Sequence, residues 1–149
     1  MERNGDLYVQ GVLANEMASP AALDEVYARS PESCLWVLVD RGEIVGSVGV
    51  KGINISDSKT NCMQLELTRM YVDASRRGMG YGRRLIEHVY THARKNSVRE
   101  VFLTTPSVNA PAIGFYRRLG FVIEREIVVQ GPDGADLELL ELLAVVPDL

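Results

Sequence analysis

The stretch "SRRGMGYGRR" (Ser75–Arg84) decides how this sequence is interpreted, because three glycines stand in it at alternate positions. Glycine loses more backbone entropy on folding than any other residue, so the backbone here either turns with positive φ or lies very close to a ligand. Arginines flank the glycines on both sides: Arg76, Arg77, Arg83 and Arg84. Since the first amides of a helix also attract anions, the stretch predicts an anion site at a helix start. The alternative is a tight turn between solvated arginines.

The elements around this stretch follow in the order strand, loop, helix, strand. "MQLELTRMYVD" (63–73) predicts a strand with Leu65 and Leu67 on one face. Apolar residues at helical spacing predict a helix from about Gly80 to Lys95. "EVFLTT" (100–105) predicts the next strand, which a right-handed crossover makes parallel to the first.

The rest of the chain predicts further antiparallel strands and helices. "CLWVLVD" and "IVGSVGVKG" predict a hairpin that turns near Arg41-Gly42, followed by a polar loop over 53–61. The other predicted elements are a short strand at Leu7–Leu13, a helix from Ser19, a helix over 109–120 and strands over 121–129 and 137–146. This order predicts the α+β class with a mixed sheet.

Length and composition exclude several classes of protein. The chain has 149 residues, of which 46% are hydrophobic, which is enough for one domain over 1–149. It has no long apolar run and its N-terminus has no apolar signal core, so we expect a cytoplasmic protein with no membrane partner. Its net charge is −4, although eight basic residues fall between Arg69 and Arg99. We therefore expect no nucleic-acid partner but allow a small polyanion at one place.

Two common phosphate-binding motifs do not match the stretch. A P-loop requires Gly, four residues and then Gly-Lys-Ser/Thr, and the sequence contains no such string. A dinucleotide-binding loop requires a third glycine at the position that Arg83 occupies. The mixed order of elements does not suit a doubly wound fold either.

A different resemblance covers both the glycine loop and the later helix. "RGMGYG" (77–82) resembles the Arg/Gln-x-x-Gly-x-Gly/Ala pyrophosphate loop of the GNAT superfamily of acetyl-coenzyme A-dependent N-acetyltransferases. "NAPAIGFYRRLGF" (109–121) is similar to a later motif of that family, in which an Asn, an Ala, Phe-Tyr and Gly-Phe follow in this order. The resemblance covers residues 63–129 and extends weakly back to Leu35.

The resemblance implies the GNAT fold: a mostly antiparallel sheet of six to seven strands, flanked by helices, with a central parallel pair splayed for coenzyme A. It implies that the pantetheine arm pairs with the end of the first parallel strand, where the N–H of Tyr71 or Val72 polarises the thioester carbonyl. The pyrophosphate is expected on the amides of residues 78 to 83. The residues implied to bind acetyl-coenzyme A are Met70, Tyr71, Val72, Arg77, Gly78, Met79, Gly80, Tyr81, Gly82, Arg83, Asn109 and Ala112.

The implied activity is direct transfer of an acetyl group to a primary amine in a ternary complex. By resemblance Glu66 is the candidate general base; it is alternatively a solvated glutamate or a group that binds a cationic substrate. Tyr116 matches a tyrosine that protonates the departing thiolate, and is alternatively a core tyrosine with a polar tip. Phe115 is expected to pack near the cofactor, and Asn109 to serve as a helix cap, a pantetheine contact or both.

The remaining polar groups carry further hypotheses. Arg76, Arg83 and Arg84 are candidates for the ribose 3′-phosphate of the cofactor or for a solvated helix face. His88 and His92 stand four residues apart, and we expect surface histidines and no metal. Cys34 is predicted to be a buried thiol, and neither it nor Cys62 is given a catalytic role.

Three hypotheses concern the acceptor and the activity. The leading hypothesis is a small-molecule amine, and the first alternative is a protein N-terminus or lysine. An alternative of another class is a non-catalytic coenzyme A-binding module. Acidic residues at 57, 133 and 136 indicate a cationic acceptor or only solvated loops. A homodimer through the last strand is left open.

Overall fold

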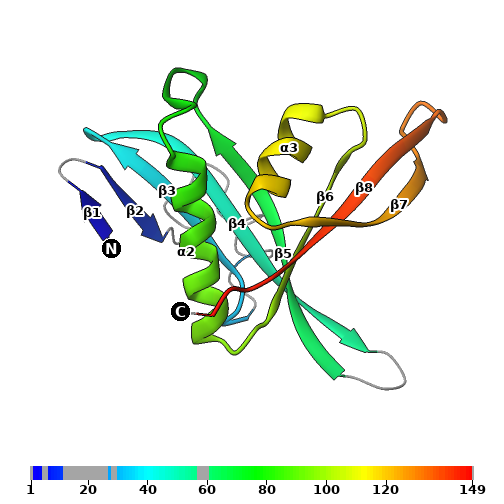
Figure 1. Ribbon diagram of the computed structural model, residues 1–149, viewed down its shortest axis with the longest axis horizontal. Coiled ribbons are helices and arrows are strands. Elements are labelled where there is room, and N and C mark those ends of the chain that lie inside the picture. The colour runs from blue at the N-terminus through cyan, green and yellow to red at the C-terminus, as the bar shows by residue number, and fades with distance from the viewer. Residues whose placement is uncertain (1, 5–6, 12–26, 28–29, 57–60, 149) are drawn as a thin grey trace.

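The computed structural model describes residues 2–4, 7–11, 27, 30–56 and 61–148, and its strands form one mixed sheet (Figure 1). The strand order is β1-β2-β3-β4-β5-β6-β8-β7, and every neighbouring pair is antiparallel except β5-β6. The bounds are β1 (Glu2–Asn4), β2 (Leu7–Gly11), β3 (Cys34–Asp40), β4 (Glu43–Ser56), β5 (Asn61–Val72), η2 (Ala74–Arg76), α2 (Tyr81–Lys95), β6 (Glu100–Pro106), α3 (Ala110–Arg118), β7 (Val122–Gln130) and β8 (Asp136–Val145). The predicted α+β class is confirmed.

The N-terminal edge of the sheet adds a strand that the sequence does not predict. β2 corresponds to the strand predicted at Leu7–Leu13, and β1 pairs with it in antiparallel register. Since β1 is the three-residue polar segment "ERN", it carries no hydrophobic alternation, and the sheet has eight strands instead of six to seven. The helix predicted from Ser19 lies outside the described residues, apart from Tyr27, which is helical.

The hairpin of β3 and β4 turns where the sequence predicts. Arg41 has a φ of 50° and Gly42 a φ of 80°, and Asp40 pairs with Glu43 across the turn. Two residues of positive φ match the right-handed twist of the flanking strands. This turn places β4 beside β3 and leaves its other edge for β5.

The hairpin of β4 and β5 is longer than predicted. Pairing continues to Ser56 and Asn61, so the prediction of a loop over all of 53–61 is wrong at both ends. Ile53 pairs with Gln64 and Ile55 with Cys62. β-Branched residues at alternate positions favour a strand, and cross-strand pairing outweighs the polar residues between them.

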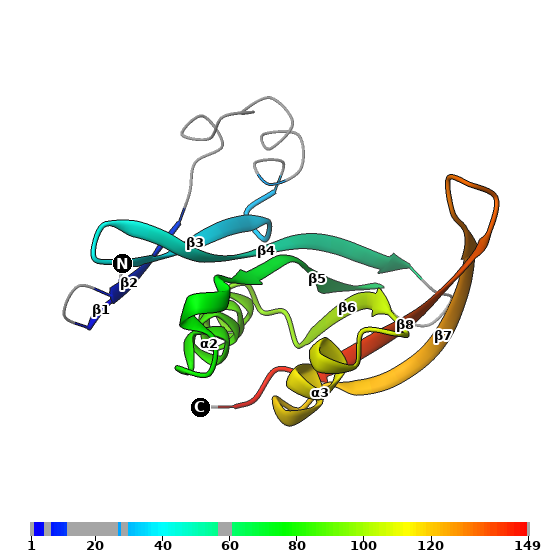
Figure 2. The same ribbon diagram turned by 90° about the horizontal axis from the view of Figure 1, so that it is seen from above.

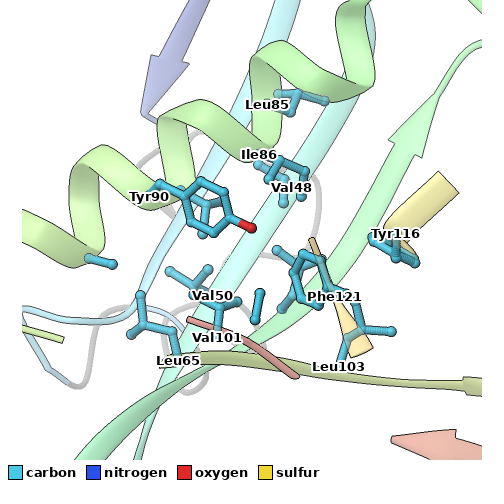
Figure 3. Close-up of a cluster of buried hydrophobic side chains, with 14 of the residues drawn as sticks. Val48, Val50, Leu65, Leu85, Ile86, Tyr90, Val101, Leu103, Tyr116 and Phe121 are labelled. Atoms are coloured by element: carbon cyan, nitrogen blue, oxygen red, sulfur yellow. The ribbon is translucent and has the colours of Figure 1, made fainter. Parts of the chain in front are cut away.

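α2 lies along one side of the sheet, on the same side as α3 (Figure 2). Its buried residues recur at helical spacing: Leu85, Ile86, Val89, Tyr90 and Ala93. Figure 3 shows this face of α2 against Val48 and Val50, which are fully buried in β4. Each large apolar side chain buried in this way contributes about 1.5–3 kcal/mol. This interface fixes the start of α2 relative to the end of β5.

The parallel strands β5 and β6 separate soon after they meet. In the described residues their register consists of two pairs, Leu65 with Val101 and Glu66 with Phe102. β6 continues beside β8 as far as Pro106, whereas β5 continues beside β4. Figure 1 shows the two strands diverging toward the end of the molecule where α3 lies. The splayed parallel pair is therefore present as predicted.

Candidate active site

A cavity of about 600 Å³ lies between the end of β5, the glycine loop, the start of α2 and α3. All but one of the residues predicted to bind the cofactor line it: Met70, Tyr71, Val72, Arg77, Gly78, Gly80, Tyr81, Gly82, Arg83, Asn109 and Ala112. Met79 is the exception, and its side chain points to solvent with 61% exposure. The fold thus brings the two sequence motifs together around one cavity.

The three glycines of the loop have two different functions in the fold. Gly78 and Gly80 have φ values of 79° and 81°, and a Cβ atom on either would meet open space. They make the left-handed turn that leads into α2, with Gly80 as its N-cap. Gly82 is helical, and a Cβ there would lie 2.8 Å from Cζ of Phe115. The sequence predicted either a positive-φ turn or close approach to a ligand; Gly78 and Gly80 make the turn, and at Gly82 the close neighbour is a side chain of α3.

The start of α2 has the features of an anion site. Its N-cap residue Gly80 has no side chain to satisfy the first amides. The first N–H groups of a helix have no intrahelical acceptor, and the positive end of the helix dipole lies there. The first three residues of α2, Tyr81 to Arg83, all line the cavity. An anionic group placed there would therefore be bound by backbone amides and by the Arg83 charge.

Arg77 and Asn109 also shape this cavity through backbone contacts. Nε of Arg77 donates to the carbonyl oxygen of Val72 at 3.2 Å, which ties the loop to the end of β5. Oδ1 of Asn109 accepts from the amide of Ala112 at 3.4 Å and caps α3, as predicted. Both side chains therefore hold the walls in place whether or not they contact a ligand.

The arginines suggested for the ribose phosphate are not equivalent. The guanidinium of Arg76 borders the cavity but forms ion pairs with Asp40, Glu43 and Asp73 at 3.5, 3.5 and 3.6 Å, so its charge is already compensated. Arg84 instead lines a separate cavity between α2 and the C-terminal residues. Of the three, Arg83 remains as the candidate at the larger cavity.

Tyr116 lies on α3 at the edge of the core and lines the same cavity (Figure 3). Its ring packs edge to face against Phe115 and Phe121, with centroids 5.2 and 5.5 Å away. The side chain is 8% exposed, and this burial raises the pKa of Tyr116 to about 12, because the phenolate would lose its hydration. The hydroxyl is therefore protonated at neutral pH, which is the form that can donate a proton.

A second cavity, of about 290 Å³, adjoins the first. Met70 and Tyr116 line both, so the two cavities meet at these side chains. Its other walls come from β5 and β6: Glu66, Leu67, Thr68, Arg69, Leu103, Thr104 and Thr105. Glu66 lines the smaller cavity and not the larger one, so the two predicted catalytic residues share the smaller cavity.

The surroundings of Glu66 contain residues that the sequence does not single out. Nζ of Lys51 lies 3.6 Å from Oε2 of Glu66, and the register pairs these two residues across β4 and β5. The hydroxyls of Thr68 and Tyr27 are hydrogen-bonded at 2.8 Å. In the sequence, the polar residues Glu66 and Thr68 alternate with two leucines. This alternation indicates one polar face of the strand, but it does not identify the residues that lie across the sheet from that face.

The histidines and cysteines have structural surroundings. His88 and His92 are half-buried, and both pack edge to face on Trp36, so they are not the plain surface residues that were predicted. Cys34 is half-buried in β3, and burial raises the pKa of its thiol, while Cys62 is exposed.

Within the described ranges, no group of three or more potential ligand side chains could hold a metal ion. No helix there has the length and apolar character needed to cross a membrane.

A family model described as "Acetyltransferase (GNAT) family" matches residues 6–121. The chain belongs to this family. Two curated relatives of this GNAT chain are N-acetylaspartate synthetase of Xenopus tropicalis, 36% identical over 71% of the chain, and human N-acetyltransferase 8B, 31% identical over 76%. The chain spans 38% and 48% of the lengths of these two relatives.

Solved GNAT structures share the fold at low sequence identity. NAA60 of Arabidopsis thaliana in complex with acetyl-CoA has a TM-score of 0.75 and 18% identity, over 94% of this chain and 98% of that one. YncA of Salmonella typhimurium, a putative acetyltransferase with its cofactor acetyl-CoA, has a TM-score of 0.72 and 15% identity, over 97% and 96%. At these identities the comparison concerns the fold alone.

Proposed function

We propose that this GNAT protein is an N-acetyltransferase that transfers the acetyl group of acetyl-coenzyme A to the primary amine of a small molecule. One observation carries the proposal: the larger and the smaller cavity meet at Tyr116, and Glu66 lines the smaller one. A cofactor in the larger cavity and an amine in the smaller one would then bring their reacting atoms together at this junction. The relative named N-acetyltransferase 8B supports N-acetylation, and the one named N-acetylaspartate synthetase supports a small amine as the acceptor.

The larger cavity fits acetyl-coenzyme A in its chemistry. The pyrophosphate would be bound by the first amides of α2 and by Arg83, where the helix dipole favours an anion. The pantetheine arm would lie along the part of β5 formed by residues 70–72, which is past the last described pair with β6. Of the backbone groups there, the carbonyl oxygen of Val72 already accepts from Nε of Arg77. The open space around Gly78 and Gly80 leaves room for the phosphates.

The reaction needs one group to accept a proton and one to donate it. The amine nitrogen attacks the thioester carbonyl carbon, a C–N bond forms, and the C–S bond breaks. One ammonium proton passes to Glu66, directly or through a water. The thiolate takes the proton of Tyr116, which the second amine proton replaces as the amide forms. Proton transfers of this kind contribute roughly 10²–10⁴-fold each.

The thioester carbonyl also gains negative charge in the transition state. The backbone N–H of Tyr71 or Val72, beside the opening between the strands, is the proposed donor to that oxygen. A fixed donor aimed at the position where this charge develops stabilises it without reorganisation. Since Tyr116 is neutral at neutral pH, it adds no negative charge near this oxygen.

The proposal is tested by measuring thiol release from acetyl-coenzyme A with a panel of amino acids, other small amines and peptides. We expect amine-dependent release that the double variant Arg77→Ala, Gly80→Asp abolishes, because it removes the tie to β5 and places a carboxylate at the anion site. If acetyl-coenzyme A binds without turnover on any amine, a non-catalytic binding module becomes the better account. If peptides alone are acetylated, the small-molecule assignment is wrong. A cytoplasmic location and a homodimer stay predictions.

A further inference from the structure

Arg69 has an unusual backbone conformation beside the smaller cavity. Its φ is 50°, in the left-handed region that residues other than glycine seldom occupy. The register of β4 and β5 shifts at the same place, because Gly49 pairs with Thr68 while Ser47 pairs with Tyr71. Two residues of β5 therefore lie opposite the single Val48. This is a β-bulge, a feature that changes the direction of a side chain and interrupts pairing.

The bulge moves Arg69 out of the core-facing series of β5. Before it, Leu65 and Leu67 are buried, and regular alternation would direct the side chain of residue 69 to the same face. After it, Met70 and Val72 pack against the core, so the alternation has shifted by one residue. Arg69 is the extra residue, and it is exposed and lines the smaller cavity.

Neighbouring groups hold Arg69 in this position. Its Nε donates to the hydroxyl oxygen of Tyr27 at 3.2 Å, and that hydroxyl is hydrogen-bonded to Oγ1 of Thr68 at 2.8 Å. Oγ of Ser47 donates to the carbonyl oxygen of Arg69 at 2.7 Å. Gly49 leaves space for Tyr27, since a Cβ there would lie 2.8 Å from the Tyr27 ring. The strained residue is therefore held in place from both sides of the strand.

The charge around the smaller cavity favours an anion near Arg69. Glu66 is compensated by Lys51 at 3.6 Å. Glu141, which pairs with Thr104 in the β6-β8 register, lies 3.1 Å from Arg125. In the part of the chain that the structure describes, no carboxylate forms an ion pair with Arg69. Nε is engaged by Tyr27, and the remaining guanidinium donors carry the charge that a substrate can use.

We propose that the acceptor of the smaller cavity is an amino acid, an amine with a carboxylate close to its amino group, and that Arg69 binds this carboxylate. This inference rests on the proposed function and names its substrate class. A guanidinium binds a carboxylate through two parallel hydrogen bonds, so it fixes orientation as well as charge. With the carboxylate at Arg69, the amino group of an α-amino acid lies on the strand face that Glu66 and Thr68 share.

The competing acceptors differ from an amino acid in this one group. The N-terminus of a peptide has an amide where the free amino acid has its carboxylate, and a simple alkylamine has neither. Arg69 therefore selects free amino acids over both. The acidic loop residues that indicated a cationic acceptor are Asp133 and Asp136, which are exposed on the β7-β8 hairpin (Figure 2), and Asp57, which lies outside the described residues.

The test uses initial rates of thiol release with several L-amino acids, each offered as free acid, C-terminal amide and amine without the carboxyl group. We expect the wild-type kcat/KM to be about 10- to 100-fold higher for the acid than for its amide, the size of one lost charged hydrogen bond. Arg69→Asn, which tolerates positive φ, is expected to bring this ratio close to one. Arg69→Lys keeps the charge without the paired donors and is expected to lie between. Arg99→Asn, at an exposed arginine remote from both cavities, is the matched control.

The outcomes separate this inference from the proposed function. A ratio near one in the wild type, or a preference for peptides, overturns the amino-acid assignment while N-acetylation stands. A high ratio that survives in Arg69→Asn overturns the role of Arg69. Thermal unfolding and acetyl-coenzyme A binding of each variant show whether a changed ratio comes from a damaged fold. Absence of turnover with every amine overturns the proposed function itself.

Discussion

The two cavities that meet at Tyr116 are built in different ways. The larger one is formed by two continuous stretches of chain: the end of β5 with the glycine loop and the start of α2, and α3 with its two flanking residues. The smaller one depends on side chains from β5, β6 and α3, and on support from Tyr27 and Lys51. The comparison teaches that the proposed cofactor site is determined by local backbone conformation, whereas the proposed acceptor site is determined by pairing across the sheet.

The largest expected effect lies in the smaller cavity. If Glu66 is the base, Glu66→Gln lowers kcat by roughly 10²–10⁴-fold while the Kd for acetyl-coenzyme A is unchanged. Steady-state kinetics with a good amine and calorimetry with the cofactor measure the two quantities. A rise in KM with unchanged kcat would mean that Glu66 only binds the acceptor. Lys51→Gln is a useful companion, because it removes the cation 3.6 Å from Glu66 and leaves the carboxylate.

The next effect lies at the junction of the cavities. Tyr116→Phe removes the proton donor but keeps the ring that packs on Phe115 and Phe121, so kcat is expected to fall by roughly 10²-fold with little loss of stability. Burial raises the pKa of Tyr116 to about 12, so this residue stays protonated up to about pH 10. At any lower pH, its ionisation therefore does not reduce the rate of the wild type. The assignment would be contradicted if the wild-type rate fell above about pH 8 and this fall were absent in Tyr116→Phe.

A smaller effect is expected on the cofactor side. Gly82→Ala puts a Cβ 2.8 Å from the Phe115 ring, which forces α2 and α3 apart and costs about 1–3 kcal/mol of the free energy of unfolding. We also expect weaker binding of acetyl-coenzyme A, because the first turn of α2 shifts. Urea unfolding and calorimetry measure both.

Two variants control that prediction. Gly114→Ala, in α3, meets only the end of the flexible Arg118 side chain at 3.3 Å, and it is expected to stabilise the helix by about 0.5–1 kcal/mol. Adding Phe115→Leu to Gly82→Ala makes room for the new methyl group and is expected to recover cofactor binding. Equal behaviour of Gly82→Ala and Gly114→Ala would show that the contact between α2 and Phe115 does not matter.

The smallest effect is a pH dependence of stability. Tyrosine ionises near pH 10 in the unfolded chain, but Tyr116 ionises near pH 12 in the folded chain. Its contribution to the free energy of unfolding is therefore fully present below about pH 10 and is lost as the pH rises to about 12. Between pH 9 and 11 the wild type is expected to lose about 1 kcal/mol more than Tyr116→Phe. Urea unfolding at both pH values measures this, and equal losses would mean that Tyr116 ionises normally.

The sequence predicts the local backbone around the larger cavity well, and for a physical reason. Gly78, Gly80 and the capping residue Asn109 act on their own backbone or on that of the next few residues, so a local pattern is sufficient. The turn at Arg41-Gly42 is of the same kind. Gly82 shows the limit, because its close partner is Phe115, a residue of the later motif.

The acceptor side could be predicted only in part. Glu66 follows from strand alternation and from family resemblance, but its partner Lys51 follows from the β4-β5 register, which the sequence does not display. The bulge at Arg69 reverses the alternation on which strand predictions depend. Tyr27 lies 41 residues from Thr68, its hydrogen-bond partner. Contacts of this range depend on the whole sheet and have no local signature.

The central claim, that two substrates occupy two adjoining cavities, is tested most directly with a conjugate in which the sulfur of coenzyme A is joined through an acetyl linker to the amine of an amino acid. Calorimetry would compare its Kd with that of coenzyme A for the wild type, Gly80→Asp and Arg69→Asn. The account predicts that the conjugate binds more tightly than coenzyme A, that Gly80→Asp weakens both, and that Arg69→Asn weakens the conjugate alone. A conjugate that binds no more tightly than coenzyme A, or an Arg69→Asn variant that weakens both equally, would contradict it.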